Sequence, residues 1–259
     1  MIRYDLELFL QLNEEYKDRP LVPSANKMSN AGFKADQGLS RSANLEKRYK
    51  IRGLRVLEIG CGRGDVALSM ARDQGCEVTG LDVRLYPEWK DRNSERLDLR
   101  KLDVTAEDFS SLGQFDFIYS FAVWEHILHP YKALQAAFQL LKPGGRMYMS
   151  ANLYRGPKAS HRYREVFFPW PHLLFSDAVF EQFYLKRNGK PSYPAWVNKL
   201  VAAEYFHYWS QIGFKVDKSW YSLTPIDEPF YERFSDVLAR YPRFDLERDF
   251  IHADLHRPK

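Results

Sequence analysis

One ten-residue stretch, residues 56–65, constrains the fold of this chain more than any other part of the sequence. It begins with the apolar run Val56-Leu57-Glu58-Ile59 and continues into a Gly-x-Gly-x-Gly turn, which a helix-forming run over residues 66–71 follows. The pattern predicts a strand, a tight turn and a helix. Gly60 and Gly62 permit backbone conformations that other residues avoid, and they let a ligand approach the main chain without meeting a Cβ atom. The turn is therefore predicted to hold a ligand.

The spacing of this turn argues against a dinucleotide site. Such sites carry Gly-x-Gly-x-x-Gly, in which the third glycine allows close helix packing and the helix N-terminus receives the anionic pyrophosphate. Here Asp65 takes the place of that third glycine, and Glu58 adds a carboxylate at the end of the strand. Two acids favour a cationic ligand, such as an amino acid sulfonium, over a diphosphate. A Walker-type phosphate loop is excluded because no Gly-Lys-Ser/Thr follows.

From this point the sequence resembles the class I S-adenosylmethionine-dependent methyltransferases, whose first motif is an acid followed by x-Gly-x-Gly-x-Gly. Further matches follow in the family's order. Residues 80–83 (Gly-Leu-Asp-Val) resemble the second strand and residues 102–104 (Leu-Asp-Val) the end of the third, while residues 115–120 resemble the fourth strand and residues 141–150 the turn and fifth strand. The resemblance is close over residues 51–151 and loose over 199–223. Ordered matches are far more specific than a glycine-rich turn alone.

The resemblance implies S-adenosyl-L-methionine as cofactor and S-adenosyl-L-homocysteine as product. It places Asp82, with Val83 beside it, where the family's carboxylate binds the ribose hydroxyls, and Asp103, followed by Val104, where the family's acid contacts the adenine amino group. The other cofactor-binding positions lie in the first motif and at the end of the fourth strand: Glu58, Gly60, Cys61, Gly62, Gly64, Asp65, Ser120 and Phe121. Taken alone, Asp82 could cap the following helix and Asp103 could be a solvated surface residue.

The alternation of strand and helix patterns predicts a parallel sheet with helices on both faces and a ligand at the carboxyl ends of the strands. The resemblance implies a Rossmann-like α/β fold with seven strands, mostly parallel, and a reversed last strand. Residues 214–217 and 220–223 are expected to supply the closing hairpin. A helix over about residues 197–212 should lead into it and end at Gly213.

Two further parts are expected on either side of the methyltransferase core, which spans residues 51–223 and contains an insertion over residues 152–198. Residues 1–50 should form an N-terminal helical lid, with helices over 2–16 and 39–50 joined by a mobile connection over 24–38, although packing on the sheet edge is an equal alternative. Residues 224–259 should form a C-terminal helical tail. Its apolar stripe either belongs to the core or docks a partner or a second copy, which would make a homodimer; it comprises Phe230, Phe234, Val237, Leu238 and Tyr241.

The insertion over residues 152–198 is expected to act as a substrate cap, because it is long, lacks clear periodicity and is rich in aromatic residues and proline. Its aromatic residues could instead form a small satellite core. A basic cluster opens the insertion and is either a solvated face or a seat for an acidic group of the acceptor; it comprises Arg155, Lys158, His161, Arg162 and Arg164.

Candidates for catalysis follow the fourth strand. Glu125-His126 resembles the Glu-His step of the quinone-type and small-molecule branch of the family. We expect His126 to act as a general base, because histidine titrates near neutral pH, with His129 and His161 as alternates. Glu125 could instead only favour a helix start while His126 packs on the sheet. Two adjacent ligands without a second pair make a poor metal site, so no resident metal is expected.

Composition narrows the class of protein. With 259 residues and 45% hydrophobic content, the chain can bury the core of one elaborated enzyme domain. A net charge of +4 permits an anionic substrate but falls short of a nucleic-acid-binding signature. Two cysteines, no membrane-spanning apolar run and no leader pattern lead us to expect a cytoplasmic protein without disulfides.

These observations together predict a methyltransferase that acts on a small-molecule acceptor and forms an O-methyl product on a hydroxylated natural product, a lipid-like precursor or a sugar. RNA methylation is one alternative. It is disfavoured because residues 120–123 (Ser-Phe-Ala-Val) lack the Asp/Asn-Pro-Pro-aromatic turn of enzymes that methylate base amino groups. A non-catalytic cofactor-binding module that docks a partner is the second alternative.

Overall fold

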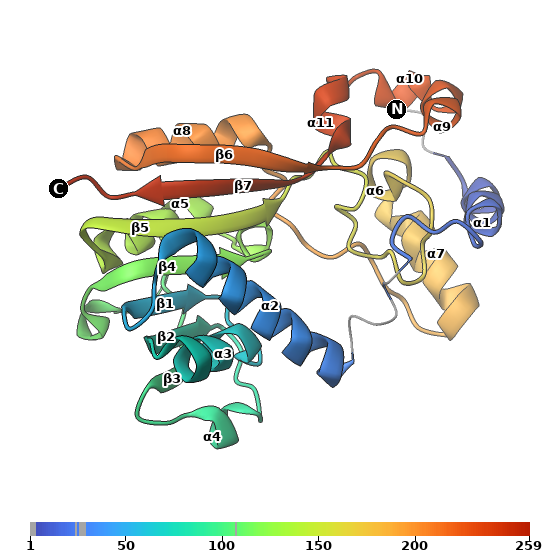
Figure 1. Ribbon diagram of the computed structural model, residues 1–259. Helices are drawn as coiled ribbons and strands as arrows, with labels where there is room; N and C mark the ends of the chain where they lie inside the picture. The colour runs from blue at the N-terminus through green and yellow to red at the C-terminus, as the bar shows by residue number, and fades with distance from the viewer. Residues whose placement is uncertain (1–3, 24, 26–29, 107) are drawn as a thin grey trace. The chain divides into compact units, whose positions relative to one another are not determined.

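The computed structural model describes residues 4–23, 25, 30–106 and 108–259. These residues form a seven-stranded sheet in the order β3-β2-β1-β4-β5-β7-β6 (Figure 1). The strands are β1 (Arg55–Ile59), β2 (Glu77–Asp82), β3 (Leu97–Lys101), β4 (Phe115–Phe121), β5 (Leu141–Asn152), β6 (Lys215–Leu223) and β7 (Arg248–His256). Neighbouring strands from β3 to β5 are parallel.

The last strand of the chain runs in the opposite direction to its neighbour β5. The Leu153 amide donates to the Asp249 carbonyl at 2.8 Å, and the Arg257 amide donates to the Gly145 carbonyl at 3.0 Å, so the paired residue numbers change in opposite senses. The predicted fold, a mostly parallel seven-stranded Rossmann-like sheet with a reversed last strand, is confirmed.

The described chain divides into two compact units. Unit 1 comprises Met1–Asn26, Asn152–Ala202 and Tyr221–Ile251, and unit 2 comprises Lys27–Ala151, Ala203–Trp220 and His252–Lys259. Each unit therefore gathers segments that are far apart in the sequence.

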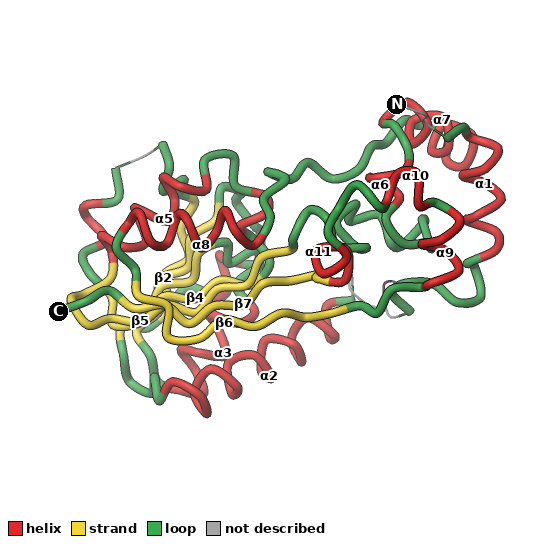
Figure 2. The backbone as a smooth tube through the Cα atoms, turned by 90° about the horizontal axis from the view of Figure 1, so that it is seen from above, coloured by secondary structure: helices red, strands yellow, loops and turns green. Residues whose placement is uncertain are grey.

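Unit 2 holds most of the sheet and the helices that cover it. Figure 2 shows α5 (Pro130–Leu140) and α8 (Ala202–Ile212) on one face of the sheet, and α2 (Ala31–Tyr49) and α3 (Asp65–Gln74) on the other. Shorter helices are α4 (Trp89–Arg92), η2 (Ser110–Leu112) and η3 (Trp124–His126). A Cβ atom on Gly38 would lie 2.6 Å from the Asp65 carbonyl oxygen, so a glycine is needed where α2 crosses the start of α3.

Helix α2 begins earlier than expected. The side chain of Asn30 caps it by accepting a hydrogen bond from the Phe33 amide at 3.1 Å, and the helix continues through Gly38 to Tyr49. The expectation of a connection reaching residue 38 is therefore wrong, because the glycines that suggested a loop lie inside a helix. Residues 24 and 26–29 of that expected connection lie outside the described residues.

Unit 1 is built around an aromatic core. Its helices are α1 (Leu6–Glu15), α6 (Pro171–Leu174), α7 (Asp177–Asn188), α9 (Glu228–Arg233), α10 (Ser235–Leu238) and α11 (Arg243–Glu247). The ring of Phe9 lies within 5.2 Å of four rings from the insertion, those of Phe168, Phe175, Phe180 and Phe183. These side chains form the satellite core that the sequence offered as an alternative.

Most of the apolar stripe of residues 224–259 belongs to the same core. Phe230, Phe234, Val237 and Leu238 are buried in it, and Tyr241 packs against it, so the core alternative is correct for this stripe.

The closing hairpin expected within residues 214–223 is wrong. Residues Lys215–Leu223 form the single strand β6, and α9 to α11 separate it from β7. The segment 224–259 thus contains helices as expected but ends in a strand of the sheet. Alternate residues of β7, among them Ile251, Ala253 and Leu255, are buried, and this period-two pattern lies among charged residues that mask it. Among the described residues, no helix has the length and apolar character needed to cross a membrane.

Candidate functional site

The glycine turn, residues 60–64, follows β1 in unit 2. Gly60, Gly62 and Gly64 have φ angles of 75°, 53° and 84°, in the left-handed region that favours glycine. A Cβ atom on Gly60 would come within 2.3 Å of the Val123 side chain, whereas one on Gly62 would meet no atom within 4 Å. Gly60 is therefore required by packing, and Gly62 leaves open space in front of the main chain.

Hydrogen bonds tie the glycine turn to the end of β2. The amides of Gly60 and Cys61 donate to the Leu81 carbonyl at 2.8 and 2.9 Å. The Gly62 amide donates to Oδ2 of Asp82 at 2.8 Å, and Oδ1 of Asp82 accepts from the Arg84 amide at 3.0 Å. The structure thus brings the predicted ribose-binding acid next to the glycine turn, as expected where parallel strands end at one edge.

The end of β3 carries the next predicted positions. Oδ1 of Asp103 accepts hydrogen bonds from the amide and hydroxyl of Thr105 at 2.8 and 2.7 Å, which closes a local turn. Val104 is buried, and Val83 after β2 is 57% exposed. An exposed valine beside the open turn offers an apolar surface to a ligand.

Glu58 is buried at the end of β1 and is only 4% exposed. The Tyr119 hydroxyl donates to its Oε2 at 3.2 Å. Burial raises the pKa of Glu58 to about 8, although the Tyr119 hydrogen bond and the Arg41 guanidinium act in the opposite direction. Glu58 is therefore largely protonated at neutral pH, and a cation placed beside it would favour its ionised form.

Asp65, the second acid of the motif, has a different environment. Its carboxylate lies 2.8 Å from Nη2 of Arg92 and 3.4 Å from Nη2 of Arg63. Since two guanidinium groups already balance its charge, Glu58 is the better candidate for contact with a cationic ligand.

Sequence reasoning missed Arg41, which α2 brings to the same region. Its guanidinium lies 4.4 Å from the centroid of the Phe121 ring. Burial lowers the pKa of Arg41, and the Glu58 carboxylate acts in the opposite direction. The available signal was its spacing of three or four residues from the buried Gly38 and Leu45, which places it on the buried face of the helix.

Ser120 and Phe121 end β4. Ser120 is fully buried, and its hydroxyl has no hydrogen-bond partner among the described residues. Ala122, which follows, has a φ angle of 54° that is uncommon for a residue other than glycine. A buried unsatisfied hydroxyl and a strained residue at one strand end are typical of a ligand site.

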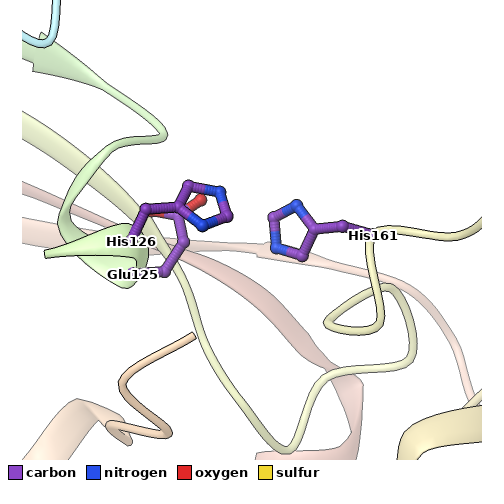
Figure 3. Close-up of side chains that lie close together, drawn as sticks. All are labelled: Glu125, His126 and His161. Atoms are coloured by element: carbon purple, nitrogen blue, oxygen red, sulfur yellow. The ribbon is translucent and has the colours of Figure 1, made fainter. Parts of the chain in front are cut away.

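The catalytic candidates Glu125 and His126 lie on η3, just after this strained residue. Glu125 is 1% exposed, whereas His126 is exposed. Figure 3 shows the two side chains, which come from neighbouring positions of η3. His129 is also exposed and precedes α5. His161, also labelled in Figure 3, belongs to unit 1. Unit 2 therefore brings together three of the four predicted catalytic residues on one connection.

Three of the five residues in the basic cluster of the insertion make contacts within unit 1. Arg155 lies 2.7 Å from Asp245, and Lys158 lies 2.7 Å from Asp249. Arg162 donates to the Tyr193 carbonyl. These contacts hold segments of unit 1 together, and they argue against a shared anion seat.

The donors and acceptors at the glycine turn fit a ligand with an amino acid end and a sugar. Glu58 offers a carboxyl group for an ammonium, Arg41 offers a guanidinium for a carboxylate, and Asp82 offers acceptors for hydroxyl groups. The open space at Gly62 leaves room for a ligand beside Asp82. The implied cofactor, S-adenosyl-L-methionine, has these groups.

Comparisons with known proteins agree with this geometry. A family model described as a methyltransferase domain matches residues 30–218. A ubiquinone biosynthesis O-methyltransferase from Aeromonas salmonicida (strain A449) is 37% identical over 112 residues, which cover 41% of this chain and 46% of that protein. The match thus spans about half the length of this relative.

Two solved structures share the fold. An S-adenosylmethionine-dependent methyltransferase from Mesorhizobium loti has a TM-score of 0.56 and 16% identity, with 86% of this chain and 100% of that chain covered. The 1,6-didemethyltoxoflavin-N1-methyltransferase from Burkholderia thailandensis has a TM-score of 0.51 and 18% identity, with 100% and 92% covered. Because the family model covers most of the sequence and the motif residues meet at one sheet edge, this chain belongs to the methyltransferase-domain family, among the class I S-adenosylmethionine-dependent methyltransferases.

Proposed function

We propose that this chain transfers a methyl group from S-adenosyl-L-methionine to a hydroxyl oxygen of a small-molecule acceptor. The observation that carries the proposal is the hydrogen bond from the Gly62 amide to Asp82 at a turn whose ligand side is open. This contact joins the glycine motif to the acid that the family uses for the ribose.

The cofactor, when bound, supplies an electrophilic methyl group on a sulfonium. Glu58 and Arg41 would hold its amino acid end, Asp82 its ribose hydroxyls, and Asp103 its adenine amino group. Phe121, Val83 and Val104 would provide apolar contacts near these groups. Because the methyl group is already activated, the main task of the protein is to align the acceptor oxygen with it, and alignment can supply several kcal/mol.

His126 would take the proton from the acceptor hydroxyl. A base is needed because an alcohol or phenol holds its proton tightly. His126 is exposed on the connection after β4, where a base could meet an acceptor, while the neighbouring Glu125 is buried. His129 and His161 are the alternate bases.

The choice of oxygen as the methylated atom has support from relatives. The curated relatives are named as O-methyltransferases of ubiquinone biosynthesis, although the toxoflavin enzyme with the same fold is named as an N-methyltransferase. The acceptor therefore has to be found by experiment.

We also propose that the protein works in a reducing, cytoplasmic compartment, because Cys61 and Cys76 are both buried free thiols.

The test is incubation of the intact chain with methyl-labelled S-adenosyl-L-methionine and a panel of acceptors: phenols, catechols, sugars, long-chain alcohols, amines and RNA. We expect label in a hydroxylated small molecule, with mass spectrometry locating it on oxygen. Label in RNA alone would contradict the small-molecule acceptor. Cofactor binding without transfer to any acceptor would favour a non-catalytic module.

A further inference from the structure

Unit 1 contains a pocket to which the proposed function assigns no role. Its volume is about 190 Å³. It is lined by nine residues, Tyr16, Arg19, Leu21, Pro157, Pro169, Trp170, Thr224, Pro225 and Asp227. All nine belong to unit 1, and none comes from the glycine turn or the connection after β4.

The lining of the pocket is mostly apolar. Three prolines, Leu21 and the rings of Tyr16 and Trp170 contribute its apolar part. The indole of Trp170 is held in place because Nε1 donates to the Leu246 carbonyl at 3.2 Å and the Trp170 amide donates to the Pro157 carbonyl at 3.2 Å. An apolar cavity of about 150 Å³ can hold benzene, so this pocket has room for one ring with a substituent.

The backbone of Trp170 supports a ligand-binding role. Its φ angle is 53°, in the left-handed region that bulky residues rarely adopt. Prolines on both sides, Pro169 and Pro171, limit how the segment can relax. Strain of this kind collects at ligand sites, and here it lies at a residue that lines a pocket.

One acid and one base stand at the polar part of the lining. Asp227 accepts hydrogen bonds from the Tyr16 hydroxyl at 2.5 Å and from the Phe230 amide at 3.2 Å. The Arg19 guanidinium lies 4.3 Å from the centroid of the Tyr16 ring, and its Nη1 is 4.0 Å from Oδ2 of Asp227. A charged substituent drawn to one of these groups would be repelled by the other. A neutral group that both donates and accepts would satisfy both.

We infer that this pocket binds an uncharged single-ring aromatic molecule that carries a hydroxyl or a primary amide group. The ring lies against the three prolines and Leu21, and the polar group donates to Asp227 and accepts from Arg19. This is a binding site in addition to the proposed methyl transfer, and its occupancy requires no cofactor.

The probe set consists of phenol, benzamide, benzoate and benzylamine, tested on the intact chain without cofactor by saturation-transfer NMR. We expect saturable binding of phenol and benzamide, with mutual competition. Benzoate and benzylammonium should bind at least about five-fold more weakly than phenol and benzamide. This difference corresponds to about one hydrogen bond. Absence of saturable phenol and benzamide binding, or a preference for either charged probe, would overturn the inference.

Two arginines provide a matched pair of variants. Arg19→Ala and Arg233→Ala each remove one ion pair to Glu15, at 3.3 and 3.0 Å, but only Arg19 lines the pocket. Arg19→Ala should weaken phenol binding by about five-fold, and Arg233→Ala should leave it unchanged. Equal effects of the two variants would contradict the assignment.

Leu21→Trp tests the location directly, because the added indole fills the pocket while Arg19 stays in place. It should abolish phenol binding, and a melting curve checks that the variant is folded. Retained binding would place the probe elsewhere. These binding measurements contain no cofactor. A negative result for phenol binding therefore does not contradict methyl transfer, and a negative result for methyl transfer does not contradict this binding site.

Discussion

The hydroxyl of Tyr119 donates a 3.2 Å hydrogen bond to the buried carboxyl group of Glu58. This contact lies at the end of β1, directly before the glycine turn. Burial disfavours the ionised form of Glu58, and the hydrogen bond from Tyr119 partly offsets this by stabilising the carboxylate. The proposed ligand brings an ammonium and a sulfonium to this carboxyl group. Binding and proton release should therefore be linked.

The first prediction concerns the pH dependence of cofactor binding. The pKa of Glu58 is raised to about 8 in the free protein, and a bound cation would lower it. Between pH 6 and 7.5 the free protein holds a proton that the complex releases, so the affinity for S-adenosyl-L-methionine should rise with pH, by up to about ten-fold per pH unit.

Calorimetry in buffers of different ionisation enthalpy would measure this proton release at pH 7. Glu58→Gln should bind the cofactor more weakly and without the proton release. A dissociation constant that stays constant over this pH range in the wild-type chain would show that Glu58 does not meet the cation.

The second prediction concerns Asp82. Asp82→Asn keeps an oxygen that can accept from the Gly62 amide but loses the charge that strengthens hydrogen bonds to hydroxyl groups. The affinity for S-adenosyl-L-homocysteine should fall by about ten-fold or more, as measured by calorimetry. Asp98→Asn is the control, because Asp98 lies on β3 and its carboxylate pairs with the exposed Arg100. Similar losses in both variants would contradict a specific role for Asp82.

The third prediction separates the candidate bases. His126→Ala should lower turnover by roughly 10²-fold or more, the usual contribution of a general base, and should leave cofactor affinity unchanged. His129→Ala, an exposed histidine on the same connection, should retain turnover. Rates with the acceptor found by labelling, together with separate binding measurements, check both. Unchanged turnover in His126→Ala would remove this assignment.

The fourth prediction concerns acid stability of unit 1. Burial lowers the pKa of His172 to about 4, and its Nε2 lies 2.7 Å from the Tyr154 carbonyl oxygen. Because the unfolded chain binds this proton more readily, with a pKa near 6.5, the folded state loses stability as the pH falls from about 6.5 towards 4. The loss from this group should be about 2 kcal/mol at pH 5 relative to pH 7.

Urea unfolding followed by tryptophan fluorescence at pH 5 and pH 7 would measure this loss of stability. His172→Gln should reduce the difference between them, whereas replacing the exposed His207 by Gln should not. If both variants keep the full pH dependence, the acid sensitivity comes from other groups.

Local sequence patterns predicted the parts of the site whose residues all belong to one continuous segment of the chain. The glycine turn and Asp82 are separated by one strand–helix–strand unit, so their spacing alone predicted that they would meet. Glu58 was predicted in place but not in charge state, because its pKa depends on burial in the folded protein, which raises it, and on Tyr119 and Arg41, which act in the opposite direction. Arg41 was missed for the same reason: only the packing of α2 across α3 brings it to the site.

The errors outside the site also have physical causes. Gly38 suggested a loop because glycine weakens isolated helices, but close contact with Asp65 requires a glycine there. Strand β7 was taken for part of a helical tail, since its alternation is masked: the buried face begins with the charged Asp249, and Arg248 and Asp254 lie on the other face. The pocket of unit 1 draws on three distant segments, and no local pattern predicts such a juxtaposition.

The most direct test of the central claim is calorimetric titration of the intact, folded chain with S-adenosyl-L-methionine. It is followed by mass analysis of a reaction with the acceptor that the labelling experiment identifies. The account predicts saturable binding at one site, loss of affinity in Asp82→Asn, and an acceptor in which one methyl group has replaced a hydroxyl hydrogen, with S-adenosyl-L-homocysteine formed in equal amount. No binding of either the cofactor or its product by folded protein would contradict it.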